Sequence, residues 1–306
     1  MIRKHTRRAV KAAFCISFAI AIVLGGVTAG ALSARSASPT IRLGTKDFSE
    51  EFVLGQLYKQ ALEAKGYKVA YHEDIGSTEV IDTALTSGKI DFYPEYTGTI
   101  LSVVFHKTTV PKTAAATYAQ AKALEGKRGF TLFAQTPFSD TDAVGTLTAT
   151  AKKYGLKTIA DLKKVPNVSL CAKPTFKTRF AGLIGIKQAY GVKNIKFVPL
   201  SGFSFYTALD NHQCTVSDVF STDPQLAGTK YSVLKDTKFI FGFQNVAPVV
   251  RKSLAAALGS KFRSTVDAVS AKLTQPAIIA MNKAVAIDHK SPADVASAFL
   301  KANGLK

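Results

Sequence analysis

The sequence predicts an α/β protein built from two lobes. Between residues 41 and 97, short apolar strands alternate with amphipathic helices, which is the pattern of βαβ units with parallel strands. A second strand–helix series starts near Val168 and runs to about residue 223. The two series share a motif, since Thr-Ala-Leu, a turn, an apolar strand and a Tyr-Thr or Ser-Thr pair occur at 83–97 and again at 207–222. Two lobes of similar plan would produce this motif twice, and so would chance similarity between amphipathic helices.

The first series opens with a predicted strand at 41–45 and a helix that begins near Ser49. Ser49 is a favourable N-cap, and Glu50 and Glu51 lie in the first turn, where the helix dipole stabilises acids. We expect the helix to end at Gly66, because glycine readily adopts the left-handed conformation that follows a helix. The series is completed by a strand at 67–71, a helix from Gly76 to Gly88 and a strand at 90–93.

The rest of the chain continues the alternation and ends in helices. Ser291 and Pro292, followed by Asp294, form a strong helix start. The predicted helices are 113–124, 151–154, 159–162, 179–190, 203–209, 255–273, 276–288 and a last one from Ser291. The predicted strands are 130–133, 143–147, 168–172, 195–199 and 215–220.

Residues 1–37 are predicted to be an export signal and a joint. Residues 1–11 carry five basic residues and no acid, residues 12–32 are uncharged and mainly apolar, and Ala29-Gly30-Ala31 provides the small residues that signal peptidase recognises. An uncleaved membrane anchor is the alternative, since about 20 apolar residues can span a bilayer. Cys15 lies inside the apolar stretch rather than at its end, so we predict no lipoprotein.

The chain is strongly basic. Its formal net charge is +19, and the six basic residues of 1–37 leave +13 for the remainder. Such a balance can indicate a nucleic-acid partner. The lysines are scattered, however, and form no long run or stripe, and an exported protein seldom meets nucleic acid. We therefore expect no nucleic-acid partner and attribute the charge to a solvated surface.

Two cysteines, Cys171 and Cys214, lie outside the N-terminal segment. An oxidising compartment permits a disulfide between them. Both are expected at the starts of strands in the same half of the chain. The sequence does not give their separation, so a disulfide and a pair of buried thiols remain the two alternatives.

Catalytic and metal-binding motifs are absent from the sequence. It contains no GxSxG, no P-loop, no HExxH and no paired CxxC. His72, His106, His212 and His289 are isolated, and we expect them on the surface rather than as metal ligands or bases. We therefore predict that the protein is not an enzyme and uses no metal or cofactor.

Polar residues gather where predicted strands end. These turns are Lys46-Asp47-Phe48-Ser49, Gly76-Ser77-Thr78, Tyr93 to Thr99 and Ser221-Thr222-Asp223. In open parallel sheets, ligands bind beyond the carboxyl ends of the strands. Helix N-termini at such places also offer free N–H groups to an anion. A single Ser-Thr pair before a helix is normally only a cap, but four such turns across two facing sheets predict one ligand cleft.

Several of these segments resemble the osmoprotectant-binding proteins of ABC transporters, which include glycine betaine, choline and carnitine binders. The matching segments are GTKDFSE at 44–50, GST at 76–78, GKID at 88–91, EYTGT at 95–99, FSTD at 220–223, APVV at 247–250 and PADVA at 292–296. The likeness runs from about Ile41 to Leu305. The EYTGT string, in order with the others, is its specific part.

The resemblance implies a type II periplasmic-binding-protein fold, with two Rossmann-like lobes, a hinge and a ligand cleft between the lobes. Lobe 1 would comprise 40–143 and 245–306, and lobe 2 would comprise 144–244. It also implies a monomeric receptor of an ABC importer, in the periplasm or on the outer face of the cytoplasmic membrane, whose closed form docks on a permease. The implied ligand carries a quaternary ammonium, which aromatic faces bind with roughly 0.5–2 kcal/mol per ring.

The sequence departs from the family at the aromatic positions that hold such a ligand. Tyr96 stands at one of them, but Phe220 replaces the Tyr that precedes Ser-Thr-Asp, and Gln244 stands where an aromatic commonly precedes Asn245. Residues 135–138 are Gln-Thr-Pro-Phe where some members have an aromatic before Asp140. A polyol, an amine or another polar solute could instead be held by the acids, or these acids could be caps or hinge salt bridges; they are Asp47, Glu95, Asp140, Asp142 and Asp223.

We predict that the ligand contacts come from the turns described above. Tyr96 would pack against the ligand, and Lys46 would pair with a ligand anion or else with Glu50. Hydrogen bonds would come from Thr78, Thr97, Thr222 and Asn245. The full predicted set is Lys46, Asp47, Ser77, Thr78, Tyr96, Thr97, Asp140, Thr222, Asp223, Gln244 and Asn245. The alternatives to an osmoprotectant receptor are the same receptor for a different polar solute (polyol, amine or sugar-like), an exported enzyme and a sensor domain.

Overall fold

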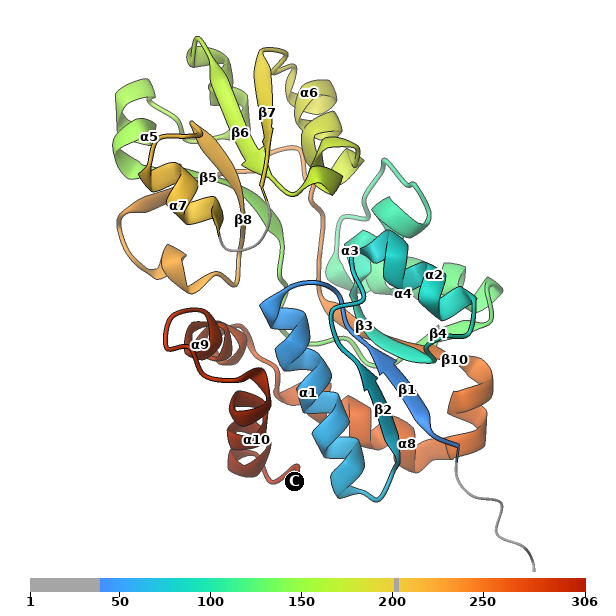
Figure 1. The fold of residues 1–306 in the computed structure, drawn as a ribbon. Coiled ribbons are helices and arrows are strands. Elements are labelled where there is room, and N and C mark those ends of the chain that lie inside the picture. The colour runs from blue at the N-terminus through green and yellow to red at the C-terminus, as the bar shows by residue number, and fades with distance from the viewer. Residues whose placement is uncertain (1–38, 201–203) are drawn as a thin grey trace, which may run out of the picture. The chain divides into compact units, whose positions relative to one another are not determined.

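The elements of the protein divide into two groups, each arranged around its own five-stranded sheet (Figure 1). The computed structural model describes residues 39–200 and 204–306, so the predicted export segment 1–37 and its alternatives lie outside the described residues. Within those described ranges, no helix is long and apolar enough to cross a membrane.

The first sheet has the strand order β2-β1-β3-β10-β4. β1 is parallel to β2 and β3, whereas β10 is antiparallel to β3 and β4. Its strands are β1 (Ile41–Gly44), β2 (Val69–His72), β3 (Phe92–Tyr96), β4 (Phe130–Leu132) and β10 (Val246–Arg251). The helices of this half are α1 (Ser49–Ala64), α2 (Thr78–Thr86), α3 (Thr97–Thr99), a π-helical segment (Ile100–Val104), α4 (Ala114–Lys127), α8 (Lys252–Lys272), α9 (Gln275–Ala286) and α10 (Pro292–Ala302).

The second sheet has the strand order β7-β6-β8-β5-β9. β6 is parallel to β7 and β8, whereas β5 is antiparallel to β8 and β9. Its strands are β5 (Asp142–Leu147), β6 (Val168–Ala172), β7 (Ile195–Pro199), β8 (Val216–Phe220) and β9 (Tyr231–Leu234). The helical elements are α5 (Thr148–Tyr154), α6 (Gly185–Tyr190), α7 (Ser204–Asp210), three 3₁₀ segments (Ile159–Lys164, Pro174–Lys177, Pro224–Ala227) and a π-helical segment (Phe180–Ile184).

The two sheets follow the same plan. In order and direction, β2-β1-β3-β10-β4 corresponds to β7-β6-β8-β5-β9. The Thr-Ala-Leu motif lies in α2 before β3 and in α7 before β8, which are equivalent places. The repeated motif therefore reflects two lobes of similar plan, and the predicted two-lobed α/β fold is confirmed.

Each sheet is mixed, which corrects the expectation of open parallel sheets. Three strands of each sheet are parallel as predicted, but β10 and β5 are antiparallel to their neighbours. The reason is that each of these two strands is reached by a segment that crosses over from the other sheet. Without a βα crossover before it, a strand is free to pair antiparallel.

Two predicted helix boundaries are wrong. α1 includes Ser49, and the N-cap position is Phe48, whose backbone is extended and whose side chain makes no capping hydrogen bond. The predicted helix at 179–190 is interrupted, because Ala181 and Gly182 have non-helical backbone and α6 covers only the last six residues. The interruption brings backbone segments close together, since a Cβ on Gly182 would collide with the carbonyl oxygen of Phe176.

The chain crosses between the two halves twice. Phe138 packs in the core of the first half and Val144 in the core of the second, so the first crossing lies between them. The return crossing lies between Phe241 of the second core and Val246 of the first. The two crossing segments, 139–143 and 242–245, are paired by an antiparallel bridge between Ser139 and Asn245.

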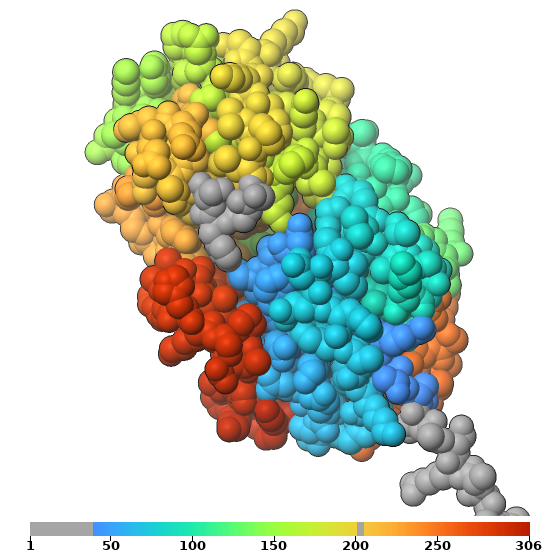
Figure 2. Space-filling model, in the orientation of Figure 1, coloured from blue at the N-terminus to red at the C-terminus, as the bar shows by residue number. Residues whose placement is uncertain are grey.

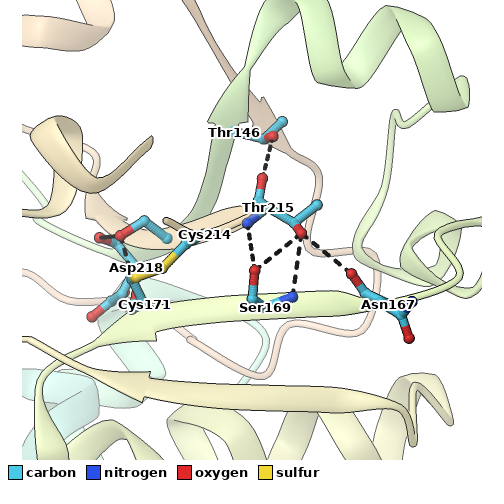
Figure 3. Close-up of a disulfide and its surroundings, with 8 residues drawn as sticks. Thr146, Asn167, Ser169, Cys171, Cys214, Thr215 and Asp218 are labelled. Carbon is cyan, nitrogen blue, oxygen red and sulfur yellow. Dashed lines mark hydrogen bonds between the residues drawn. A yellow bond between two sulfur atoms is a disulfide. The ribbon is translucent and has the colours of Figure 1, made fainter. Parts of the chain in front are cut away.

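Cys171 and Cys214 form a disulfide in the second half (Figure 3). Cys171 lies in β6, and Cys214 comes shortly before β8, the strand that pairs with β6. Beside the disulfide, the backbone N–H of Thr215 donates to Ser169 Oγ at 2.9 Å, and Thr146 Oγ1 donates to the Thr215 carbonyl at 2.7 Å. Of the two alternatives that the sequence left open, the structure contains the disulfide.

Candidate functional site

A pocket lies where the two halves meet, with an empty volume of about 610 Å³ that includes open solvent. Figure 2 shows the molecule hollowed at this junction. The first half contributes the turn after β1, the start of α2 and the end of β3. The second half contributes β5, β8 and the segment after β6. The lining residues are Lys46, Asp47, Phe48, Ser77, Thr78, Tyr96, Thr99, Asp140, Asp142, Lys173, Thr175, Phe176, Arg179, Asp218 and Phe220.

Three aromatic rings line this pocket from both halves. The Phe48 ring stacks on the Tyr96 ring, with centroids 6.2 Å apart. On the other half, the Phe220 ring lies nearly parallel to Phe48, with centroids 6.3 Å apart and an interplanar angle of 4°. The pocket therefore has aromatic faces on each side of the junction, and Phe48 connects them.

Lys46 is buried in the pocket lining and is surrounded by acids and rings. Its Nζ lies 2.5 Å from Glu95 Oε1 and 3.8 Å from Glu51 Oε1. The same Nζ lies 4.2 Å from the centroid of the Tyr96 ring. Of the two predicted pairings of Lys46, the one with Glu50 is wrong, because Glu95 and Glu51 hold the ammonium group.

Two ion pairs join the halves across the pocket. Lys173 Nζ lies 2.9 Å from Asp47 Oδ1, and Arg179 Nη2 lies 2.8 Å from Glu79 Oε2. Burial raises the pKa of Glu79, but hydrogen bonds from Arg179 and Ser77 outweigh it and lower this pKa to about 2. All three cations of the pocket lining are thus paired with acids of the first half.

Glu50 also connects the halves, as a buried acceptor. It accepts hydrogen bonds from Tyr96 Oη, Thr222 Oγ1 and Asn282 Nδ2, each at 2.7 Å. Burial raises the pKa of Glu50, and these three donors oppose the rise. Burial likewise raises the pKa of the neighbouring Glu51 to about 8, although Lys46 acts in the opposite direction.

The second half places carboxyl groups at the pocket without cations to pair with them. Asp142 and Asp218 lie on β5 and β8, and Asp140 lies just before β5. Burial is the main reason that the pKa values of all three rise, and neighbouring carboxylates raise those of Asp140 and Asp218 further. Among the residues the structure describes, none of the three forms a salt bridge.

The structure brings most of the predicted contact residues to this junction. Those that line the pocket are Lys46, Asp47, Ser77, Thr78, Tyr96 and Asp140. Thr222 and Asp223 line a neighbouring hollow of about 790 Å³, open solvent included, which also contacts Phe48 and Phe220. In that hollow, burial raises the pKa of Asp223 to about 6 despite hydrogen bonds from the Phe220 N–H and Tyr206.

Three predicted contact residues line neither hollow. Thr97 donates to the Phe243 carbonyl, and Gln244 accepts from the backbone N–H of Thr99 at 2.9 Å and donates to Phe241. Asn245 donates to the carbonyls of residues 136 and 138, both at 3.0 Å. These side chains instead fasten the return crossing segment, because buried amides satisfy their hydrogen bonds with the nearest backbone.

Several lining residues are missing from the predicted set. Phe48, Lys173, Arg179 and Phe220 line the pocket, and so does Asp218. A signal for Asp218 was present in the sequence, since an acid in the middle of the apolar strand Val-Ser-Asp-Val-Phe is unusual for a buried position. Lys173 and Arg179 carry no comparable signal, because their role depends on acids in the other half.

The described residues contain no group of three or more His, Cys, Asp or Glu side chains arranged to hold a metal ion. In this structure the acids of the pocket region are hydrogen-bond acceptors, as Glu50 is, or counter-charges, as Asp47 is. Such groups can bind a small polar molecule without covalent chemistry.

Two similar lobes, joined by paired crossing segments around a polar and aromatic pocket, define the class of the periplasmic binding proteins. Residues 39–302 match the family model described as the substrate binding domain of an ABC-type glycine betaine transport system, and the chain belongs to this family. The expected membership and function class are thereby confirmed. The family consists of substrate-binding transport proteins, which act outside the cytoplasm.

Known proteins of this kind are similar over most of the chain. A glycine-betaine-binding protein of Pseudomonas aeruginosa is 31% identical over 278 residues, covering 87% of this chain and 88% of that protein. The carnitine transport binding protein OpuCC of Listeria monocytogenes is 26% identical over 272 residues, covering 88% of each chain. The solved structure of apo YehZ from Escherichia coli has a TM-score of 0.63 and 26% identity, and covers 88% of this chain and 100% of that one.

The fold is also that of a solved glycine betaine/carnitine/choline ABC transporter structure. That structure has a TM-score of 0.69 and 23% identity, and it covers 87% of this chain and 99% of its own. The type II binding-protein architecture expected from the sequence is therefore confirmed.

Proposed function

We propose that this protein binds a small quaternary ammonium solute in the pocket between its halves and delivers it to an ABC permease. The observation that carries the proposal is the set of Phe48, Tyr96 and Phe220, which bring aromatic faces from both halves to one polar pocket. A methylated ammonium cannot donate hydrogen bonds, so aromatic faces and nearby carboxylates are the groups that can attract it. The relatives named for glycine betaine and carnitine support the same ligand class.

The position of Lys46 supports the proposal from within the protein. Its ammonium group lies over the Tyr96 ring at 4.2 Å and over the Phe48 ring at 5.6 Å. Lys173 Nζ also lies 5.3 Å from the centroid of the Phe48 ring, so the rings of this pocket are already placed around two cations. A ligand ammonium would use the ring faces that these two lysines leave.

In this proposal the predicted contact residues have different roles. Tyr96 and Phe48 would pack against the ligand, and Ser77, Asp47 and Asp140 would face it from the lining. Thr78 and Thr222 would act through the buried acids that they donate to, Glu95 and Glu50. The three residues of the crossing region, Thr97, Gln244 and Asn245, would hold the hinge.

The two crossing segments would form the hinge. We propose that lobe 1 comprises 40–143 and 245–306 and that lobe 2 comprises 144–244, with bending at the Ser139–Asn245 bridge. A ligand that contacts both lobes stabilises the closed form by its higher affinity for that form. The pairs Lys173–Asp47 and Arg179–Glu79 would break when the lobes open, since each joins one lobe to the other.

The proposal also covers where the protein acts and whether it is an enzyme. The protein would be exported through its N-terminal segment and would act as a monomer in the periplasm or on the outer face of the cytoplasmic membrane. It would not be an enzyme, because binding and closure require no covalent step.

A thermal-shift and calorimetry series tests the proposal. The purified protein is titrated with choline, carnitine, glycine betaine and 3,3-dimethylbutan-1-ol, which is the uncharged carbon analogue of choline. Binding raises stability by mass action, by about 2.7 kcal/mol when the ligand is at one hundred times its Kd. We expect at least one quaternary amine to bind and the uncharged analogue to bind much more weakly. Equal binding of choline and its uncharged analogue, or no binding of any amine, would contradict the proposal.

Variants locate the site. Phe48→Leu and Phe220→Leu keep an apolar side chain but remove the aromatic face, so each is expected to weaken binding of the amine about three- to thirtyfold. Phe239→Leu is the matched control, because Phe239 is 63% exposed and lines neither hollow. The control variant should bind as the unchanged protein does.

A further inference from the structure

Asp142 and Asp218 form an acid pair on the second-half wall of the pocket. In the register of β5 and β8, Asp142 is opposite Phe220 and Val144 is opposite Asp218. The two acids are therefore diagonal neighbours on one face of the sheet, close enough for their side chains to meet. Both line the pocket together with Phe48 and Phe220.

One oxygen of this pair is left unsatisfied among the residues that the structure describes. Asp218 is only 3% exposed, and its buried Oδ1 atom has no hydrogen-bond partner within those described ranges. A buried carboxylate oxygen without a donor is costly, and it is uncommon in native structures. An oxygen of this kind in a pocket lining indicates a group that arrives with the ligand.

The lysines and the arginine of the pocket lining pair with other acids, not with Asp142 or Asp218. Lys46 is held by Glu95 and Glu51, Lys173 by Asp47, and Arg179 by Glu79. Each lysine and arginine of the lining is therefore already paired with an acid of the first half, and the lining has no spare cation for the acid pair.

Burial makes a negative charge on either acid of the pair unfavourable. Burial raises the pKa of Asp218 well above its usual value, and the charges of Asp142, Asp223 and Asp140 add to the rise, while Arg179 opposes it. Asp142 is buried too, which raises its pKa, while Arg179, Lys46, its own backbone N–H and a hydrogen bond with Asp218 oppose the rise.

We propose that Asp142 and Asp218 select ligands that carry a hydroxyl or N–H donor beside the quaternary ammonium. This inference rests on the proposed function and narrows its ligand class. Glycine betaine has no hydroxyl and no N–H, so it would bring no hydrogen-bond donor to this wall. A hydroxylated quaternary amine such as choline or carnitine instead brings the donor that Asp218 Oδ1 lacks.

Two pairs of ligands that differ only in the donor test the inference. Choline is compared with n-propyltrimethylammonium, in which a methyl group replaces the hydroxyl, and carnitine is compared with 4-(trimethylammonio)butanoate, which lacks the hydroxyl. In calorimetric titrations of the unchanged protein, we expect each hydroxylated ligand to bind at least about tenfold more tightly than its partner, because the acceptor is a buried charged group. Equal affinities within both pairs would overturn the inference.

Two variants assign the preference to the acid pair. Asp218→Asn and Asp142→Asn each remove one acid with little change of shape, and we expect the affinity ratio within each ligand pair to fall toward one. Removing a carboxylate should weaken the attraction for the ammonium of both ligands of a pair, so the affinity ratio within the pair, rather than either affinity alone, is the readout. If one variant does not fold, the other variant and the ligand comparison in the unchanged protein still decide the outcome. A ratio that persists in both variants would overturn the inference.

Asp210→Asn is the matched control, since Asp210 is an aspartate of the same half that pairs with Lys230 and lines neither hollow. Its affinity ratio should equal that of the unchanged protein. The inference and the proposed function fail differently. If no quaternary amine binds, the proposed function fails and the inference falls with it. If the amines bind without preferring a hydroxyl, or if glycine betaine binds most tightly, only the inference fails.

Discussion

The two halves of the protein share strand order and direction but differ in how charge is satisfied at the pocket. In the first half, Lys46 lies between Glu95 and Glu51 and supplies a cation to both acids, although Glu51 Oε1 has no hydrogen-bond partner among the described residues. In the second half, the cations of the lining pair with acids across the junction, and Asp142 and Asp218 form no salt bridge within the part of the chain that the structure describes. The comparison shows that one fold plan places turns at a common junction, while the charges left unpaired there determine what the pocket can bind.

The largest expected effect concerns the disulfide between Cys171 and Cys214, which lies in the second half. Replacing Cys171 and Cys214 together by serine should lower the free energy of unfolding by about 4 kcal/mol, because the disulfide closes a loop over a sequence separation of 43. Denaturation with guanidinium measures the loss, and reduction of the unchanged protein should reproduce it. An unchanged midpoint in both experiments would show that the disulfide does not stabilise this half.

The second prediction tests the acid that joins the halves. Tyr96 donates to Glu50 Oε1, and Thr222 and Asn282 donate to Oε2, so Glu50→Gln places an NH₂ group opposite one or two of these donors. Loss of these buried hydrogen bonds is expected to cost about 2–3 kcal/mol in the free energy of unfolding. Glu63→Gln is the control on the same helix, because Glu63 is exposed and pairs only with Lys59. Equal denaturation midpoints for the two variants would contradict the prediction.

The third prediction concerns pH and the acid pair. Acids whose pKa is raised by folding stabilise the protein below their unfolded pKa, and this stability is lost as the pH rises through the folded pKa. Burial raises the pKa of Asp223 to about 6 and that of Glu51 to about 8. The ligand-free protein should therefore lose stability between about pH 4 and 8. Asp218→Asn removes one buried acid whose pKa is raised.

This variant should therefore be more stable than the unchanged protein at pH 8, by about 1–2 kcal/mol, and its stability should depend less on pH. Unfolding free energies between pH 4 and 8 provide the measurement, with Asp210→Asn as the control. A variant that is less stable at pH 8 would indicate that Asp218 has a partner and is not strained.

The smallest expected effect concerns the pair Arg179–Glu79, which crosses the junction. Both side chains are partly exposed, so we expect Arg179→Gln to change the free energy of unfolding by about 1 kcal/mol or less. Its effect should appear instead in the balance between closed and open forms, as a larger radius of gyration of the ligand-free protein in X-ray scattering. If the radius is unchanged while Lys173→Gln increases it, the pair Lys173–Asp47 alone holds the halves together.

Much of the fold could be predicted from the sequence because its signals are local. Strands β6 and β7 lie where the apolar runs predicted them, at Val168–Ala172 and Ile195–Pro199. The repeated Thr-Ala-Leu motif left open whether the lobes are similar or the likeness is chance, and the structure decides for similar lobes, since the copies lie in α2 before β3 and in α7 before β8. The direction of the antiparallel strands β5 and β10 was harder to predict from the sequence, because it depends on a chain that crosses between lobes.

The pocket was only partly predictable for a similar reason. Lys46, Asp47 and Tyr96 lie in turns at strand ends and could be placed by that rule. Gln244 and Asn245 also lie near a strand end, but their NH₂ groups donate to backbone carbonyls and neither residue lines the pocket. Strand-end position therefore identifies candidates, whereas hydrogen-bond competition decides which of them face a ligand.

By itself, the sequence determined the alternation of strands and helices, the two-lobed plan and the family to which the chain belongs. The alternation and the two-lobed plan follow from residue spacing and local backbone preferences, which act over a few residues, whereas the family was indicated by segments such as EYTGT at 95–99 that resemble known members. Tertiary structure alone decided that Lys173 and Arg179 pair with acids of the other half and that Asp218 Oδ1 remains without a donor. Those outcomes depend on which charged groups, distant in sequence, are buried side by side, and burial is what makes an unpaired charge costly.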